Sequence, residues 1–217
     1  MYDTIFFDLD GTLTDSGPGI TNSVMYALRR FGITVENRES LYPFIGPPLL
    51  DSFQRFFGFT EEQARQAVVY YREYFSAGGL FENSVYPGVP EMLGRLQSAG
   101  RRLWVATSKP EDFARSIIGH FSLGCYFEGV CGAGMDGTRT RKDEVLRYAL
   151  GLSGAVPARS LMVGDREHDV FGASVCGLDC LGVLYGYGSR EELNAAGAKY
   201  IAAGVGDVAE LILGAGS

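Results

Sequence analysis

Short, continuous apolar runs recur along the sequence of 217 residues, and stretches with helical periodicity separate them. Runs that are apolar at consecutive positions are typical of parallel strands buried on both faces of a sheet. The expected strands are Thr4–Asp8, Leu103–Thr107, Ser160–Gly164 and Cys180–Leu184, with a weaker candidate at Gly129–Cys131. Strands that alternate with helices predict an α/β fold with a doubly wound parallel sheet and helices on both faces.

The helices expected between and after these strands share an apolar face and end near small or polar residues. They are Pro90–Ala99, Glu111–His120, Lys142–Leu150, Val170–Cys176 and Glu191–Ala196. Ser189 and Glu192, at the start of the last helix, have the spacing of a capping box.

The stretch from about Asp15 to Tyr86 breaks this alternation, because it contains helical patterns and no convincing strand. The expected helices are Ile20–Phe31, Leu49–Phe57 and Glu61–Phe75, the last with Thr60 and Gln63 in capping-box spacing. Fourteen of the 26 Phe and Tyr residues fall here, enough for a separate small core. We interpret residues 16–86 as a helical insert, with linkers at residues 17–19 and 86–88. The alternative is that these helices cover one face of the sheet.

The net charge, the apolar runs and the cysteine spacing argue against several classes of function. The net charge of −7 argues against a nucleic-acid-binding protein, which needs clustered cations. The N-terminus has no basic region typical of a signal peptide, and no apolar run approaches the roughly 20 residues of a membrane span. The four cysteines show no spacing typical of a zinc site. We therefore expect a cytoplasmic protein that binds neither nucleic acid nor membrane.

Two aspartates directly follow the first apolar run, in the segment Asp8-Leu9-Asp10-Gly11-Thr12. Ligands of a doubly wound sheet bind beyond the carboxyl ends of its strands. Because side chains alternate along a strand, Asp8 and Asp10 can face the same crevice, and Gly11 lets the chain turn away sharply. Carboxylates this close repel unless a cation or a proton separates them, and magnesium prefers such oxygen ligands. A capped turn without a ligand is the alternative.

A second acidic group follows the expected strand Ser160–Gly164, in the segment GDREHD at residues 164–169. Asp169 comes four residues after Asp165, so it would lie one helical turn onward on the same side. Both side chains could reach a metal ion held by the first pair of aspartates.

Two further segments place polar side chains where an expected helix begins. One carries two hydroxyl groups and the other a lysine. Thr107 and Ser108 end a strand and open a helix, where hydroxyl and N–H groups suit a phosphoryl oxygen, although both residues are also common helix caps. Lys142 precedes another helical stretch and could neutralise both a phosphate and the acidic groups. Taken singly, a lysine there is more often solvated.

Four motifs of the sequence, taken in order, resemble those of the haloacid dehalogenase superfamily. They are Asp8-x-Asp10-Gly-Thr, Thr107, Lys142 and Gly164-Asp165-x-x-x-Asp169. The resemblance covers the whole chain, because the helical insert looks like the cap domain of that family. FFDLDGTLTDS near the start, GPPL at 46–49 and GTRTRKDEVLRYAL at 137–150 are similar to phosphoglycolate phosphatase-like members. The resemblance implies a Rossmann-like core of residues 1–15 and 87–217 with a helical cap of residues 16–86.

The same resemblance implies a magnesium-dependent phosphatase that forms an aspartyl-phosphate. Asp8 would attack phosphorus, and Asp10 would protonate the leaving oxygen and then deprotonate a water molecule. Mg²⁺ would be held by the Asp8 carboxylate, the Asp10 main-chain carbonyl and Asp165. Asp169 would be a ligand itself, or would act through water or Lys142.

The phosphoryl oxygens would be bound by side chains and by main-chain N–H groups, which stabilise the charge that spreads over them. The side chains would be those of Thr107, Ser108 and Lys142, and the N–H groups would come from Leu9 and Asp10.

Several activities remain open at this point. Dehalogenases lack an acid at the position of Asp10, which favours phosphate monoesters as the small-molecule partner. The expected enzyme is phosphoglycolate phosphatase-like, with a 5′-nucleotidase or a sugar-phosphate phosphatase as alternatives. A phosphomutase, or a module that binds phosphate without turnover, is less favoured. The chain could be a monomer or a homodimer.

Overall fold

The computed structural model describes residues 1–214, and the chain forms two compact units. One, the core unit, combines Met1–Thr14 with the chain from Val85 onward, and the other, the helical unit, is Asp15–Ser84. Two short strands lie where the chain passes between the units, β2 (Thr14–Asp15) and β3 (Ser84–Val85), and they pair with each other. The described helices include none that is long and apolar enough to cross a membrane.

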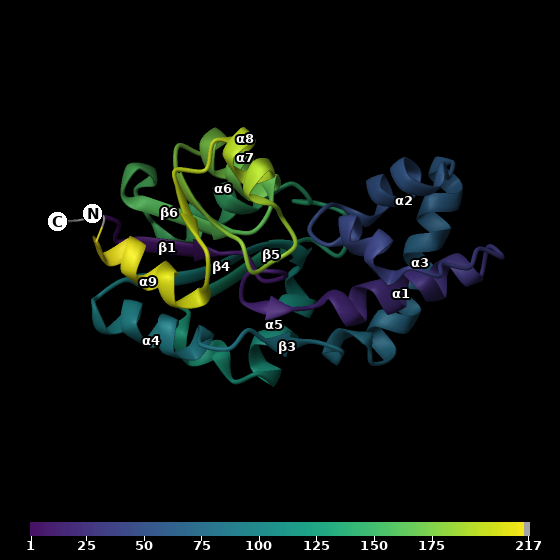
Figure 1. The fold of residues 1–217 in the computed structure, drawn as a ribbon, viewed down its shortest axis with the longest axis horizontal. Coiled ribbons are helices and arrows are strands. Elements are labelled where there is room, and N and C mark those ends of the chain that lie inside the picture. Colours follow the sequence, from purple (N-terminus) through teal and green to yellow (C-terminus); the bar gives the residue numbers. More distant parts are fainter. Residues whose placement is uncertain (215–217) are drawn as a thin grey trace. The chain divides into compact units, whose positions relative to one another are not determined.

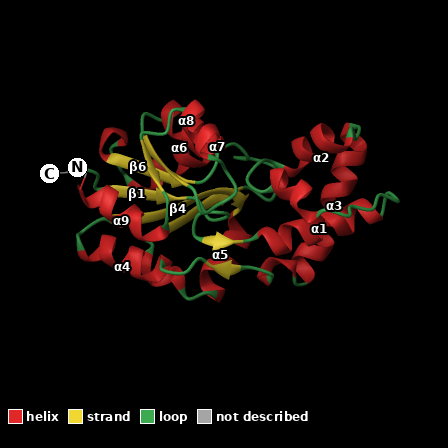
Figure 2. Cartoon of the chain, viewed as in Figure 1, coloured by secondary structure: helices red, strands yellow, loops and turns green. Residues whose placement is uncertain are grey.

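A six-stranded sheet with the order β5-β4-β1-β6-β7-β8 forms the centre of the core unit (Figure 2). Its strands are β1 (Thr4–Phe7), β4 (Arg102–Pro110), β5 (Gly129–Ala133), β6 (Ser160–Gly164), β7 (Asp179–Val183) and β8 (Tyr200–Ala202). All neighbouring strands are parallel, with Ile5 of β1 level with Leu103 of β4 and Leu161 of β6. The predicted parallel α/β sheet is therefore confirmed, although β8 was not predicted.

Helices cover both faces of this sheet (Figure 1). One face carries α6 (Lys142–Ser153), α7 (Glu167–Val175) and α8 (Arg190–Ala196), and the other carries α4 (Val89–Ser98), α5 (Glu111–His120) and α9 (Val205–Gly214). Alternate strand residues, among them Phe6, Trp104 and Met162, form one core cluster with Leu146 of α6 and Leu193 of α8. Their neighbours along the strands are also buried, which explains why the strands are apolar at consecutive positions.

Three short 3₁₀ segments complete the described elements: η2 (Gly79–Phe81) in the helical unit, and η3 (Leu123–Tyr126) and η4 (Pro157–Arg159) in the core unit. The predicted capping box before α8 is only half formed. The Ser189 side chain accepts the Glu192 N–H, but the Glu192 carboxylate instead accepts bonds from Arg166 Nε and the Glu167 N–H. Glu192 therefore joins α8 to the start of α7.

Side chains of α5 bind the edge strand β5. Arg115 donates to the carbonyl oxygen of Val130 at 2.8 Å, and Glu111 accepts a bond from the Gly132 N–H at 3.2 Å. Arg115 and Glu111 also form an ion pair at 2.7 Å. Main-chain groups of β5 are in this way satisfied by the helix that follows β4.

The helical unit contains α1 (Gly17–Arg29), η1 (Arg38–Phe44), α2 (Leu49–Phe57) and α3 (Glu61–Ala77). The expected linker at residues 17–19 is wrong, because these residues form the first turn of α1. Proline is tolerated at that position, since the first N–H groups of a helix have no intrahelical partner. The capping box of Thr60 and Gln63 before α3 is present.

Aromatic side chains form the core of the helical unit. Phe53 lies 5.1 Å from Phe44 and stacks on Phe59 at 5.9 Å between ring centroids, and Phe59 also contacts Phe31 at 4.7 Å. These rings come from the turn after α1, from η1, from α2 and from the loop before α3, so they join these segments in one core. The concentration of Phe and Tyr in this part of the sequence is explained by this core.

Candidate active site

Three buried aspartates meet beyond the carboxyl ends of β1 and β6. Asp8 follows β1, Asp165 follows β6 and Asp169 lies in the first turn of α7, and one carboxylate oxygen of each falls within 4.8 Å of the others. Their exposed fractions are 4%, 0% and 1%. We call these residues the carboxylate cluster. The structure thus brings together the two acidic segments that the sequence analysis singled out.

Lys142, the first residue of α6, supplies a buried cation to this cluster. Its ammonium group lies 2.8 Å from Asp8 Oδ1 and 2.8 Å from Asp169 Oδ1, and it donates to the carbonyl oxygen of Ala106 at 3.1 Å. Its side chain is 4% exposed, so this lysine is not solvated. A cation at a helix N-terminus opposes the helix dipole, and the two carboxylates offset that cost.

Asp165 is fixed by the chain on two sides. Its Oδ2 accepts the N–H of Tyr187 at 2.8 Å, and its Oδ1 lies 3.5 Å from the hydroxyl group of Thr12. Gly11 has φ +79°, and a Cβ atom there would lie 2.2 Å from Asp165 Oδ2. Gly188, in the loop after β7, would place a Cβ atom 1.8 Å from the Asp165 carbonyl oxygen. This loop matches none of the predicted site segments, and its dense pattern of glycine and tyrosine is its one signal in the sequence.

Asp169 is held by its own helix as well as by Lys142. Its Oδ2 accepts the N–H of Arg166, the residue that precedes α7, at 3.1 Å. An acid at this position satisfies one of the free N–H groups at a helix start. The carboxylate therefore has a fixed orientation, with one oxygen on the helix and the other beside Lys142.

The carboxylate of Asp10 is bound by a second lysine, Lys109. Lys109 Nζ donates to Asp10 Oδ1 and Oδ2 at 2.7 and 2.8 Å, and the main-chain N–H of Lys109 donates to Thr107 Oγ1 at 3.2 Å. The pairing of β4 with β5 is irregular between Ala106 and Pro110, where these residues lie. Asp8 and Asp10 thus each have a lysine of their own, Lys142 and Lys109.

Lys109 is a residue that sequence reasoning missed. It lies two positions after Thr107 on the same strand, and the period of two would have placed both on one side. Two other residues predicted to contact phosphate, Leu9 and Ser108, have weaker support in the structure. The side chain of Leu9 is fully buried in the core, so it could reach a phosphate only through its main chain, and Ser108 is half-buried beside Thr107.

Burial and mutual repulsion shift the protonation of these groups. Burial, together with the charges of Asp169 and Asp10, raises the pKa of Asp8 to about 6 even though Lys142 opposes this. Burial and the neighbouring charges of Asp169 and Asp8 raise the pKa of Asp165 well above its ordinary value. Burial lowers the pKa of Lys142, but Asp169 and Asp8 outweigh it and the pKa is raised. The ammonium is therefore charged at neutral pH.

These residues fit a divalent cation. The carboxyl groups outnumber the ammonium groups by four to two, in Asp8, Asp10, Asp165, Asp169, Lys109 and Lys142. When all are ionised, two negative charges are in excess in a buried site. Asp8 Oδ1 and Asp169 Oδ1 lie close to Lys142 without hydrogen-bond geometry, so each keeps a lone pair for another ligand. Carboxylate oxygens are the ligands that Mg²⁺ prefers.

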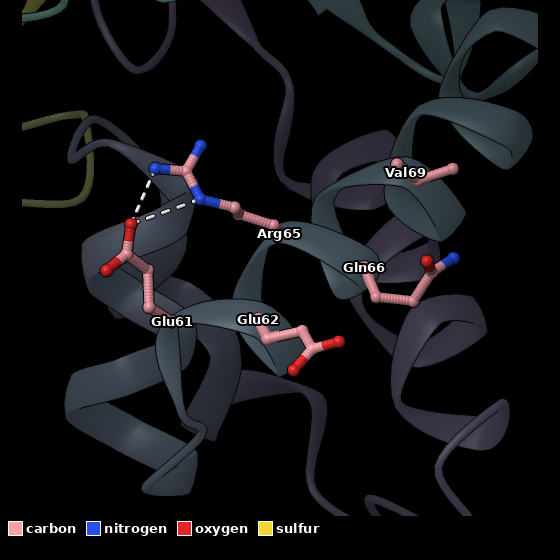
Figure 3. A pocket seen from close by; sticks show the side chains of 5 residues that line it. All are labelled: Glu61, Glu62, Arg65, Gln66 and Val69. Carbon is pink, nitrogen blue, oxygen red and sulfur yellow. Dashed lines mark hydrogen bonds and ion pairs between the residues drawn. The ribbon is translucent and has the colours of Figure 1, made fainter.

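A surface hollow of about 460 Å³ on the helical unit is a poorer candidate. It is lined by Glu61, Glu62, Arg65, Gln66 and Val69, which all belong to α3 (Figure 3). Its arginine is bound by Glu61 at 2.6 Å, an exposed pair one helical turn apart that stabilises little. The carboxylate cluster, with its buried charges, is therefore the candidate active site.

Comparison with known proteins identifies relatives of the whole chain. Residues 5–183 match the family model described as haloacid dehalogenase-like hydrolase. A 5′-nucleotidase of Pseudomonas aeruginosa is 50% identical over 89% of this chain and 88% of its own length. Tyrosine-protein kinase PtkA of Mycobacterium tuberculosis is 43% identical over 86% of this chain, which spans 64% of the length of that relative.

A further relative and a solved structure are similar to the chain over most of its length. Phosphoglycolate phosphatase 1 of Pseudomonas aeruginosa is 31% identical over 84% of this chain and 70% of its own length. The crystal structure of a predicted phosphatase from Clostridium acetobutylicum superposes with a TM-score of 0.96 at 47% identity, covering 99% of both chains.

Proposed function

The chain belongs to the haloacid dehalogenase-like hydrolase family and is a phosphatase of small phosphate monoesters, and we propose that it works through an aspartyl-phosphate formed on Asp8. The observation that carries this proposal is the position of the Asp8 carboxylate, buried beyond the end of β1 beside the ammonium group of Lys142. A carboxylate held there by a fixed cation is placed to attack a phosphorus atom rather than to exchange protons with bulk water.

In the first step, a carboxylate oxygen of Asp8 forms a bond to phosphorus while the bond from phosphorus to the leaving oxygen breaks. Asp10 gives its proton to that oxygen, so the leaving group departs as a neutral alcohol. The Thr107 hydroxyl group and the Lys142 ammonium group bind non-bridging phosphoryl oxygens. Such pre-aimed donors stabilise the charge that spreads over those oxygens in the transition state.

In the second step, a water oxygen attacks phosphorus and Asp10 takes the proton that the water loses. The bond between phosphorus and Asp8 breaks, which releases inorganic phosphate and restores the carboxylate. Splitting one displacement into two steps lowers the barrier of each, and Asp10 acts as acid and then as base without a net change.

A magnesium ion fits the same group of residues. The carboxylates of Asp8 and Asp165 and the main-chain carbonyl of Asp10 would hold it, with Asp169 as a further ligand or as the partner of Lys142. When bound, Mg²⁺ withdraws negative charge from the phosphoryl group and allows the anionic nucleophile to approach. The carboxylates of Asp8, Asp165 and Asp169 are the kind of oxygen ligand that such an ion needs.

We further propose that residues 16–86, which include nearly all of the helical unit, serve as a cap that selects the leaving group. The name of the 5′-nucleotidase relative, which is 50% identical to this chain, supports nucleoside 5′-monophosphates as the first substrates to test. Phosphoglycolate and sugar phosphates follow. The kinase name of PtkA supports including ATP with a tyrosine acceptor as a further assay. A cytoplasmic location stays a prediction of the sequence.

The experiment measures phosphate release from nucleoside 5′-monophosphates, 2-phosphoglycolate and sugar phosphates. The wild type is assayed with Mg²⁺ and with a chelator, beside the variants Asp8→Asn and Asp179→Asn. Asp179 is a matched control, because its carboxylate pairs with Tyr2 and Lys199 at the opposite end of the sheet. We expect release that needs Mg²⁺, is lost in Asp8→Asn and is kept in Asp179→Asn.

Two results would contradict the proposal. Release that survives Asp8→Asn would show that Asp8 is not the nucleophile. Transfer of phosphate from ATP to tyrosine, without release from any of the monoesters, would replace the phosphatase with a kinase.

A further inference from the structure

The Lys109–Asp10 ion pair is a second buried charge pair of the site, and the chemistry described above assigns Lys109 no part. Lys109 Nζ contacts both oxygens of the Asp10 carboxylate, although the residues are 99 positions apart in the sequence. The two side chains are 5% and 10% exposed. Because one ammonium group contacts both oxygens, it fixes the position of the carboxylate.

Such a pair is poor evidence for a contribution to stability. Burying an ammonium group and a carboxylate costs about as much free energy as their attraction returns, and apolar residues of the same size often serve as well. A role in geometry accounts better for the pair, since Asp10 has to present its carboxyl group to the leaving oxygen within hydrogen-bond distance.

The main chain of Lys109 adds a second link. Its N–H donates to Thr107 Oγ1 at 3.2 Å, so the oxygen of that hydroxyl group is occupied and its hydrogen is free to turn toward a phosphoryl oxygen. The main chain of Lys109 therefore orients Thr107, which is proposed to bind phosphate. The side chain of Lys109 orients Asp10, the proposed proton donor. The irregular pairing of β4 after Ala106 re-aims this segment toward the site.

We propose that Lys109 is a positioning residue that acts through Asp10, holding its carboxylate where it meets the leaving-group oxygen. This inference rests on the proposed function. It predicts that Lys109 matters where the leaving group needs a proton and matters little where it does not. An alkyl phosphate needs protonation of its leaving oxygen, whereas 2,4-dinitrophenyl phosphate releases a stable anion.

The test compares the first turnover of these two substrates in Lys109→Met, which keeps the length of the side chain and removes the donor. We expect release of the alkyl leaving group to slow about 10- to 100-fold, within the range of general acid catalysis, and release of dinitrophenolate to slow less than about threefold. Lys109→Gln, which keeps an N–H donor, should recover part of the loss. Lys199→Met is the matched control, because Lys199 forms a 2.7 Å pair with Asp179 away from the site.

A double-mutant cycle with Asp10→Asn tests whether Lys109 acts through Asp10. We expect Lys109→Met to have no further effect once Asp10 is asparagine. Equal slowing of both substrates, or an undiminished effect in the Asp10→Asn background, would overturn the proposal and make Lys109 a phosphate ligand or a structural residue. If Lys109→Met does not fold, the same comparisons are made with Lys109→Gln.

Failure of this inference is distinguishable from failure of the proposed function. Asp8→Asn, assayed in parallel, reports on the nucleophile alone. Turnover that persists in Asp8→Asn contradicts the aspartyl-phosphate mechanism. An inactive Asp8→Asn together with equal effects of Lys109→Met on both leaving groups contradicts only the role of Lys109.

Discussion

The ammonium group of Lys142 lies 2.8 Å from Asp8 Oδ1, and both side chains are buried. The same ammonium group also contacts Asp169, so replacing it leaves two buried carboxylates without their cation. We expect Lys142→Met to lower kcat about 100- to 1,000-fold, the loss typical of one transition-state donor. In the metal-free protein, it should lower the free energy of unfolding by about 3–5 kcal/mol.

Phosphate release and urea unfolding in the presence of a chelator check this prediction. Lys199→Met again serves as the control, because its half-exposed pair with Asp179 should change the free energy of unfolding by less than about 1 kcal/mol. Equal effects of the two substitutions on activity would contradict the role given to Lys142.

The raised pKa of Asp8 makes the stability of the metal-free protein depend on pH. Its pKa is about 6 in the folded protein and 3.8 in a free side chain, so between these values the folded state binds more protons than the unfolded state. The free energy of unfolding therefore falls as pH rises through this window. The destabilisation is absent below the lower value and complete above the higher one.

Asparagine cannot ionise, so Asp8→Asn should escape this destabilisation. We expect the metal-free variant to be more stable than the wild type at about pH 8, by up to about 3 kcal/mol, and the difference to vanish near pH 4. Urea unfolding of both proteins with a chelator, at a series of pH values, measures it. A difference that does not change with pH would show that Asp8 is not buried as an ionised group.

Magnesium alone, without substrate, should stabilise the wild type. A ligand that binds only the folded state adds about 2.7 kcal/mol at a concentration of 100 times its Kd. We expect a rise in Tm with added Mg²⁺ in the wild type, a strongly reduced rise in Asp165→Asn and an unchanged rise in Asp179→Asn. An equal rise in Asp165→Asn would place the ion elsewhere.

The close approach of Gly188 to Asp165 gives a prediction about a residue outside the acidic segments. A Cβ atom at Gly188 would lie 1.8 Å from the Asp165 carbonyl oxygen, so the main chain has to shift. We expect Gly188→Ala to cost about 1–3 kcal/mol of stability and to weaken the response of Tm to Mg²⁺. Gly151→Ala is the control, because Gly151 lies in α6 with open space around it, and alanine there should stabilise the helix by about 0.5–1 kcal/mol.

Much of the fold was predictable, because the strands of a buried parallel sheet are apolar at consecutive positions. The run Ser160–Gly164 was predicted with its observed bounds, and Glu111–His120 likewise among the helices. β8 was missed, since an edge strand needs fewer apolar residues and Tyr200–Ala202 is only three residues long. The helix α9 that follows was missed with it.

The site was predictable where chemistry and position coincide at a strand end, as for Asp8, Asp165 and Asp169. What the sequence could not show is which cation meets which anion. The pairing of Asp10 with Lys109 depends on how β1 and β4 lie side by side, and the spacing within either segment says nothing about it. The contact of Gly188 with Asp165 was hidden for the same reason, since it joins two loops that follow β6 and β7.

The binding of β5 by Arg115 and Glu111 has a consequence for how this protein behaves at high concentration. An exposed edge strand offers free main-chain groups on which a strand of another molecule can align, and such pairing is the start of aggregation. A strand of another molecule that paired with β5 would first have to displace Arg115 and Glu111, which form an ion pair at 2.7 Å and bind the main chain of β5. The charged side chains of α5 therefore block edge-to-edge pairing of β5 with a strand of a second copy of the protein.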